Sequence, residues 1–185
     1  MRRLAVWAGY AAVAVLALGG AGPAPDAGRW SVVAEDASGA VVVARSLPPD
    51  GTFALAYEHS AYHAPTVEVF AAAGRRFTMY AVGSPNEAVL DYYAVAGTRS
   101  PASGWWLLRL EQPQMFDELP LIATPVGRRT LVAGPDCVPL FPAAGGTDLR
   151  IRITHDRLTE GRTEPCPPGV LATVRGASAH SETSA

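Results

Sequence analysis

The densest group of side chains that could do chemistry lies between Tyr57 and Glu68. It contains His59, Ser60 and Glu68, which are the residue types of a general base, a nucleophile and an orienting acid. Adjacent residues of a strand point to opposite faces of its sheet, so His59 and Ser60 cannot face one another while both are in a strand. We therefore expect no catalytic site of this type.

Three other interpretations of the same segment stay open. His59, His63 and Glu68 could bind a metal ion and form the site of a metal-dependent enzyme of the cell envelope, because imidazole and carboxylate groups suit zinc. Alternatively, His59 is a buried residue at a strand end whose ring nitrogens bond to Glu68, a backbone carbonyl or a hydroxyl. The third interpretation is a recognition surface for a ligand or partner, because tyrosines are favoured at interfaces. The tyrosines concerned are Tyr57, Tyr62, Tyr92 and Tyr93.

The composition excludes several classes of function. The chain has 185 residues, and its 15 basic residues, all arginines, are spread along it and balanced by 17 acids to a net charge of −2. Without a cluster of basic residues or a net positive charge, the chain has no surface suited to the phosphate backbone of a nucleic acid. The sequence also has no nucleophile-elbow, zinc-protease, Cys-x-x-Cys, phosphate-loop or dinucleotide-binding motif. We therefore expect a protein that is not an enzyme and needs no cofactor.

The N-terminal segment and the cysteines predict export. Arg2 and Arg3 precede an apolar run that ends in small residues, which is typical of a secretory signal peptide. We expect a signal over residues 1–21, or an uncleaved anchor that is the only membrane contact, followed by a flexible spacer over 22–28. Cys137 and Cys166 fit an oxidising compartment, and we expect them to form a disulfide.

The remainder of the chain predicts a single all-β domain over residues 29–175 and a disordered tail over 176–185. Short runs of strand character alternate with turn signals, which favours an antiparallel β-sandwich or a partly open barrel of about ten strands. The expected strands cover residues 30–34, 40–46, 52–59, 66–73, 77–82, 88–93, 105–111, 129–133, 148–154 and 170–174.

Some segments carry more detailed expectations. Residues 148–154 alternate apolar and polar, as in a strand with one wet face. Residues 41–43 are all valine, which favours a strand between two layers. Residues 119–122 fit a helical turn or a strand equally well, and residues 94–104 are expected to form the longest loop. Of the two adjacent tryptophans, Trp105 and Trp106, we expect one in the core and one exposed.

The pairing of strands 52–59 and 66–73 decides whether the polar residues meet. We expect a register that places Thr66 opposite His59 and Glu68 opposite Tyr57, all on one face. His59 and Glu68 would then be diagonal neighbours. The alternative register sets Glu58 opposite Glu68, and like charges directly opposite one another are destabilising.

Residues 53–62, together with 65–70, resemble the His-Ser motif of the domain-of-unknown-function family 1850. The pattern of that family falls here on His59, Ser60, Pro65 and Glu68, whereas Ala61 and residues 83–90 depart from it. The family consists of small exported bacterial proteins, often encoded beside the fused permease of TAXI-type TRAP transporters. The resemblance implies an extracytoplasmic location in the cell envelope and a partnership with a TRAP permease or substrate-binding protein.

Overall fold

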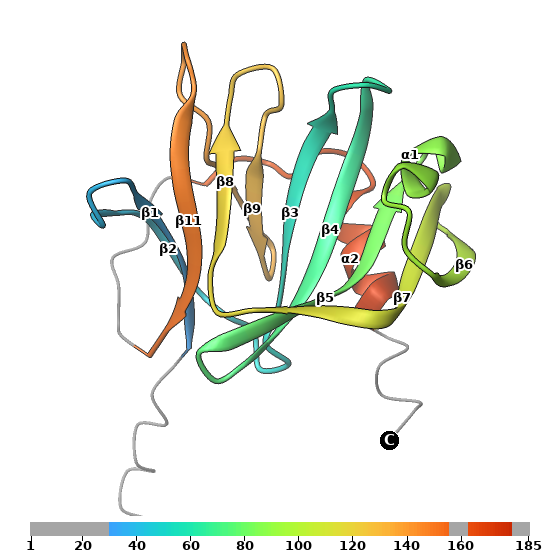
Figure 1. The fold of residues 1–185 in the computed structure, drawn as a ribbon, viewed down its shortest axis with the longest axis horizontal. Coiled ribbons are helices and arrows are strands. Elements are labelled where there is room, and N and C mark those ends of the chain that lie inside the picture. Colours follow the sequence, from blue (N-terminus) through green and yellow to red (C-terminus); the bar gives the residue numbers. More distant parts are fainter. Residues whose placement is uncertain (1–29, 156–162, 179–185) are drawn as a thin grey trace, which may run out of the picture.

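The computed structural model describes residues 30–155 and 163–178, which form two packed antiparallel sheets (Figure 1). The expected signal, spacer and most of the expected tail lie outside the described residues. The four-stranded sheet has the order β2 (Val41–Ser46), β1 (Ser31–Asp36), β11 (Thr147–Thr154) and β8 (Leu119–Ala123). The seven-stranded sheet has the order β10 (Asp136–Pro139), β9 (Thr130–Ala133), β3 (Thr52–His59), β4 (Ala64–Ala73), β5 (Arg76–Ser84), β7 (Trp105–Phe116) and β6 (Gly97–Ala102). The predicted all-β sandwich is confirmed.

Two segments predicted as strands are helices instead. Residues 88–93 lie largely in helix α1 (Glu87–Tyr92), because the side chain of Asn86 accepts a hydrogen bond from the backbone N–H of Ala88 at 3.1 Å and caps the first turn. Residues 170–174 begin helix α2 (Val170–Ser178), whose buried residues Val170, Thr173 and Ala177 recur at helical spacing. The expected domain boundary at 175 is therefore placed too early, since α2 continues to Ser178.

Other predictions were wrong at the edge strands of the two sheets. The expected loop over 94–104 contains edge strand β6, where Pro101 is tolerated because an edge strand needs fewer backbone donors. The valines of β2 are not sandwiched, because β2 is also an edge strand, and Val41 and Val42 are exposed by 46% and 49%. Residues 119–122, left open above, belong to strand β8, and strand β10 was not expected.

Two finer expectations are confirmed. In β11, Leu149, Ile151 and Ile153 are buried while the two arginines between them are exposed. Trp105 is buried and Trp106 is exposed. Both results follow from strand alternation, which sends successive side chains to opposite faces of a sheet.

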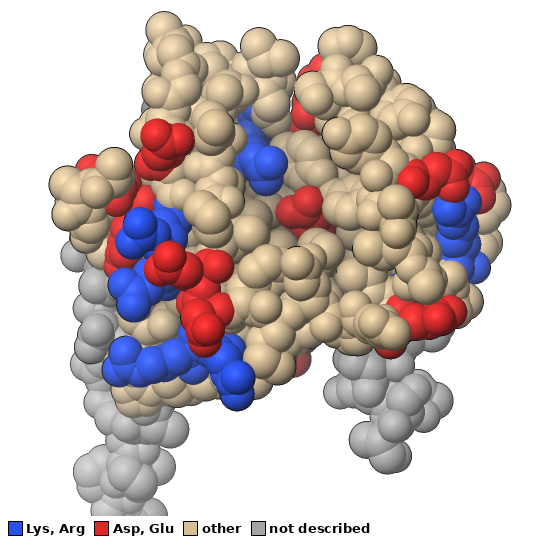
Figure 2. Space-filling model, in the orientation of Figure 1, with Lys and Arg blue, Asp and Glu red and all other residues tan. Residues whose placement is uncertain are grey.

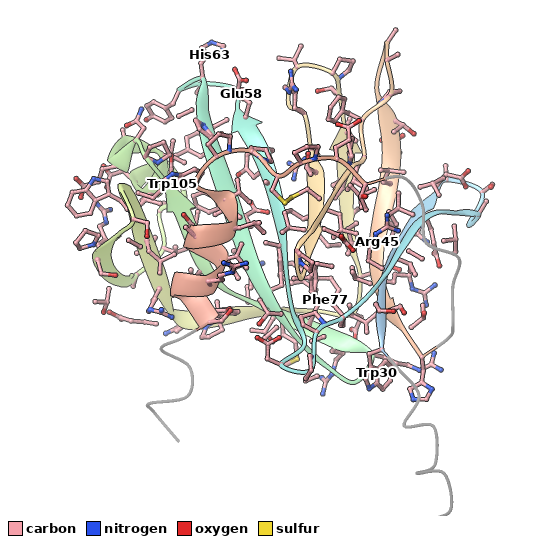
Figure 3. The ribbon with its side chains drawn as sticks, turned by 180° about the vertical axis from the view of Figure 1, so that it is seen from behind. Trp30, Arg45, Glu58, His63, Phe77 and Trp105 are labelled. Carbon is pink, nitrogen blue, oxygen red and sulfur yellow. A yellow bond between two sulfur atoms is a disulfide. The ribbon has the colours of Figure 1, made fainter. Side chains whose placement is uncertain are left out.

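The core between the two sheets is aromatic at one end. Phe53 stacks on Phe70 with ring centroids 5.0 Å apart, and Phe77 meets both rings edge-on. Arg45 of β2 is buried nearby, with its Nε 4.0 Å from a carboxylate oxygen of Asp136 in the opposite sheet (Figure 3). Apolar packing between the buried side chains of the two sheets holds them together.

The outer face of the seven-stranded sheet is covered by α2, as Figures 1 and 3 show from opposite sides. Gly83 lets the helix approach, because a Cβ there would lie 2.5 Å from the Thr173 side chain. Arg109 donates two hydrogen bonds of 2.8 Å to carbonyls of the last helical turn, at Gly176 and Ala177, where a cation is favoured.

The predicted disulfide is present on this side of the molecule. Cys137 of β10 and Cys166 are joined by an S–S bond of 2.03 Å, which ties the segment before α2 to the sheet. Within the described ranges, no helix has the length and apolar character needed to span a membrane.

Candidate functional site

The pairing of β3 with β4 sets which polar side chains meet. His59 lies opposite Ala64, Tyr57 opposite Thr66, and Leu55 opposite Glu68. The face is the one expected, since His59, Tyr57 and Glu68 point to the same side of the sheet. The pairing is shifted by two residues, however, so the prediction that His59 and Glu68 are diagonal neighbours is wrong. The shift arises because the strands continue to His59 and Ala64 and are joined by a short turn.

His59 is buried and fixes this turn. Its Nδ1 accepts a hydrogen bond from the backbone N–H of Ala61 at 3.3 Å, and its carbonyl accepts one from the N–H of His63 at 2.8 Å. Its ring meets Tyr92 edge-on at 4.6 Å and contacts Tyr62 at 5.2 Å. His59 is therefore a buried residue at a strand end, as in the structural interpretation, but among the described residues its ring bonds to a backbone N–H and not to Glu68, a backbone carbonyl or a hydroxyl.

The remaining polar residues of the turn are exposed. Ser60 lies at the surface, and the side chain of His63 is 75% exposed, with its Nδ1 3.6 Å from Oε1 of Glu58. Figure 3 shows Glu58 and His63 together at one end of the hairpin. His59, His63 and Glu68 do not come together, and no group of three or more potential ligands among the described residues is arranged to hold a metal ion.

Glu68 instead joins two tyrosines inside the molecule. Its Oε1 accepts hydrogen bonds from the hydroxyl of Tyr57 at 3.1 Å and from that of Tyr93 at 2.6 Å, and the two hydroxyls also contact each other. Tyr57 comes from β3, Glu68 from β4, and Tyr93 from the end of α1. The helix that the sequence did not predict therefore supplies one of the three groups.

The tyrosines stay protonated over a wide pH range. Burial raises the pKa of both Tyr57 and Tyr93 well above the usual value for a phenol, and the negative charge of Glu68 raises each pKa further. At neutral pH both hydroxyls are therefore neutral groups that can donate hydrogen bonds to the Glu68 carboxylate.

Arg129 completes this group from the neighbouring strand. It immediately precedes β9, which pairs with β3, and its guanidinium carbon lies 4.7 Å from the centroid of the Tyr57 ring. A guanidinium on an aromatic face is held in orientation while its N–H groups stay available at the edge. Arg129 is not among the candidate residues found in the sequence, and only its place at the start of a predicted strand could have drawn attention to it.

Glu68 and Arg129 both line a pocket of about 690 Å³ between the two sheets. The four-stranded sheet contributes its other wall through β8 and β11. In Figure 2 this face of the molecule is hollowed at its middle, and acidic and basic side chains are visible within the hollow. The lining residues are Asp36, Ala37, Glu68, Leu119, Pro120, Leu121, Ile122, Arg129, Asp148, Leu149 and Arg150. This volume falls in the range typical of small-molecule sites.

A second cavity, of about 200 Å³, lies beside the disulfide and the start of α2. It is lined by Cys137, several prolines and two groups that face solvent, Arg128 and Glu164. It is smaller than the pocket between the sheets and, although Tyr57 lines it, neither Glu68 nor Arg129 does. The pocket between the sheets is therefore the stronger candidate site.

Comparisons with known protein families, curated proteins and solved structures found no match for this chain. The resemblance to family 1850 therefore stays a prediction. A function for the chain has to be argued from the residues of its own pocket.

Proposed function

We propose that this chain is an exported protein of the cell envelope that binds a small molecule in the pocket between its two sheets. The observation that carries the proposal is that Glu68 and Arg129, two groups of opposite charge, line the same pocket. Apolar side chains combined with charged groups that can orient a ligand are a usual makeup of a ligand site. Binding is favoured over catalysis because Glu68 is already engaged by two neutral phenols, which is an arrangement for holding a carboxylate in place.

Preorganisation supports the proposal. Tyr57 and Tyr93 hold Glu68 by hydrogen bonds, and the guanidinium of Arg129 stacks on the ring of Tyr57. A ligand that meets groups already held in place loses less binding energy to ordering them. The disulfide between Cys137 and Cys166 supports an oxidising, extracytoplasmic location.

We further propose that the protein works with a TAXI-type TRAP transporter, by contact with its permease or its substrate-binding protein. This part is supported by the resemblance of residues 53–70 to family 1850, whose members are often encoded beside such permeases. Crosslinking in native membranes followed by affinity capture tests it. Recovery of permease or substrate-binding protein peptides with this chain is the expected result, and their absence from repeated captures contradicts the partnership.

The binding proposal is tested by native mass spectrometry of the protein purified from its native host without denaturation. We expect a small-molecule adduct on the wild type and its loss from the Glu68→Gln variant, because the amide has no charge and its NH2 group donates where a carboxylate oxygen accepted. Glu58→Gln is the matched control, since Glu58 lies in the same hairpin but outside this pocket. An adduct that persists in Glu68→Gln, or is lost equally in Glu58→Gln, would exclude this pocket as the binding site.

A further inference from the structure

We propose that the ligand of this pocket is a small monocarboxylate that also carries a hydroxyl or an amino group. This inference rests on the proposed binding function and specifies its chemistry. It follows from two groups that could each take a further partner, the guanidinium of Arg129 and one carboxylate oxygen of Glu68. The charges around these two groups restrict the ligand further.

The first capacity belongs to Arg129. Four other arginines of the described residues are within 4.0 Å of a carboxylate, namely Arg45, Arg99, Arg150 and Arg152. Arg129 has no such partner anywhere in the described part of the chain, although it lines the pocket and is held against Tyr57. The planar fork of a guanidinium matches the two oxygens of a carboxylate. A carboxylate on the ligand is the group that this fork fits best.

The second capacity belongs to Glu68. Both tyrosine hydroxyls contact its Oε1, and across residues 30–155 and 163–178 no donor reaches its Oε2. A carboxylate oxygen accepts hydrogen bonds but cannot donate them while ionised. A ligand group that meets Oε2 must therefore be a donor, which a hydroxyl or an ammonium group provides.

The surrounding charges select against ligands with several carboxylates. Asp36, Glu68 and Asp148 line the pocket, whereas one of its two arginines, Arg150, is already paired with Glu118 at 3.4 Å. A second anionic group on the ligand would meet like charge without a free cation to compensate it, which makes such ligands poor binders. Leu121 and Leu149, the buried residues of β8 and β11 in the lining, offer an apolar wall for the body of the ligand.

A matched series of probes tests the inference by calorimetry. Leucine and 2-hydroxy-4-methylpentanoate carry both groups, 4-methylpentanoate lacks the donor, and leucinamide lacks the carboxylate. We expect the wild type to bind the first two at least about tenfold more tightly than either of the others, since a hydrogen bond to a charged group contributes at least that factor.

Variants assign each preference to its residue. Arg129→Gln should reduce the preference for leucine over leucinamide to about one, and Glu68→Gln should do the same for leucine over 4-methylpentanoate. Arg128→Gln is the control, because Arg128 is exposed and stacks on Phe141 outside this pocket. Should Arg129→Gln not fold, Arg129→Lys keeps the charge without the fork, and it should still weaken the preference for the carboxylate severalfold.

Three results would overturn the inference. The first is tighter binding of leucinamide than of leucine by the wild type, and the second is a preference for leucine over leucinamide that survives in the Arg129 variants. The third is no binding of any carboxylate probe at millimolar concentration. If a neutral compound then occupies the pocket and is lost in Glu68→Gln, the binding function stands and only the ligand class fails. If no compound occupies the pocket at all, both proposals fail.

Discussion

The two ends of the β3–β4 hairpin present opposite chemistry on the same face of the sheet. At one end the paired residues Phe53 and Phe70 are completely buried against the other sheet. Toward the other end Tyr57 and Glu68 are only partly buried, and Glu68 lines the pocket between the sheets. One end is filled by packing, and the other is held by hydrogen bonds between polar side chains.

This difference separates what stabilises the fold from what is available for function. Burial of apolar rings supplies most of the favourable free energy of folding. A half-buried carboxylate costs free energy unless its hydrogen bonds are made, which is why Glu68 needs Tyr57 and Tyr93. We therefore expect substitutions at the aromatic end to affect stability, and those at the polar end to affect titration and binding more than stability.

Phe53→Ala should have the largest effect. Truncating this fully buried ring leaves a cavity and should lower the free energy of unfolding by about 3–5 kcal/mol. Urea unfolding followed by circular dichroism measures the loss. Tyr62→Ala, at an exposed position, is the control and should change little. A loss below about 1 kcal/mol for Phe53→Ala would mean that packing at this end contributes little to the free energy of unfolding.

The disulfide on the outer face should come next. Replacing both Cys137 and Cys166 by serine should lower the free energy of unfolding by roughly 3–4 kcal/mol, because the bond restricts a long loop in the unfolded chain. The same urea experiment, with and without reductant on the wild type, checks the value. Equal stability of oxidised and reduced wild-type protein would contradict it.

The polar end should make stability depend on alkaline pH. The pKa values of Tyr57 and Tyr93 are raised in the folded state, so the unfolded chain loses these protons first, near pH ~10. The stabilisation is complete below that pH and falls as pH rises above it, by up to about 1.4 kcal/mol per pH unit for each tyrosine. Urea unfolding at a series of alkaline pH values measures this slope.

Glu68→Gln separates the two causes of these pKa shifts. Removing the negative charge should lower the pKa of both tyrosines, while burial keeps each above its usual value. Ultraviolet absorbance of the phenolates gives the midpoints. Unchanged midpoints for the buried tyrosines would show that Glu68 does not act on them.

Tyr57→Phe should have the smallest effect on stability. It removes one hydroxyl but leaves the ring under Arg129, so we expect a loss of about 0.5–1.5 kcal/mol, the net contribution of one hydrogen bond. Thermal unfolding compared with wild type checks this. A loss as large as that of Phe53→Ala would show that the polar end contributes as much to stability as the aromatic end.

Strand positions could be predicted from the sequence because alternation and turn residues are local signals. The edge position of Val41 and Val42 could not, because an apolar run looks the same in a central strand and at an edge. Helix α1 escaped prediction because a helix of six residues shows too little periodicity, although Asn86 is a recognisable cap.

The candidate site was predictable only in part. Tyr57, Glu68 and the face that they share follow from the hairpin. The residue that lies directly opposite Glu68 depends on the length of the turn, which differs by two residues from the expected length. Tyr93 and Arg129 reach the site from α1 and from the start of β9. Whether these two residues lie at the site depends on the order of strands in the sheet, which cannot be predicted from any local sequence pattern.

The most direct test of the account is to locate a bound ligand by NMR. Titrating leucine into isotopically labelled protein should shift the backbone amide signals of Glu68, Leu121 and Arg129, which come from both walls of the pocket. The signals of Thr173 in α2, on the opposite face of the seven-stranded sheet, should not move. Shifts confined to α2 and the disulfide region, or no shifts for any small molecule tested, would contradict a binding site between the sheets.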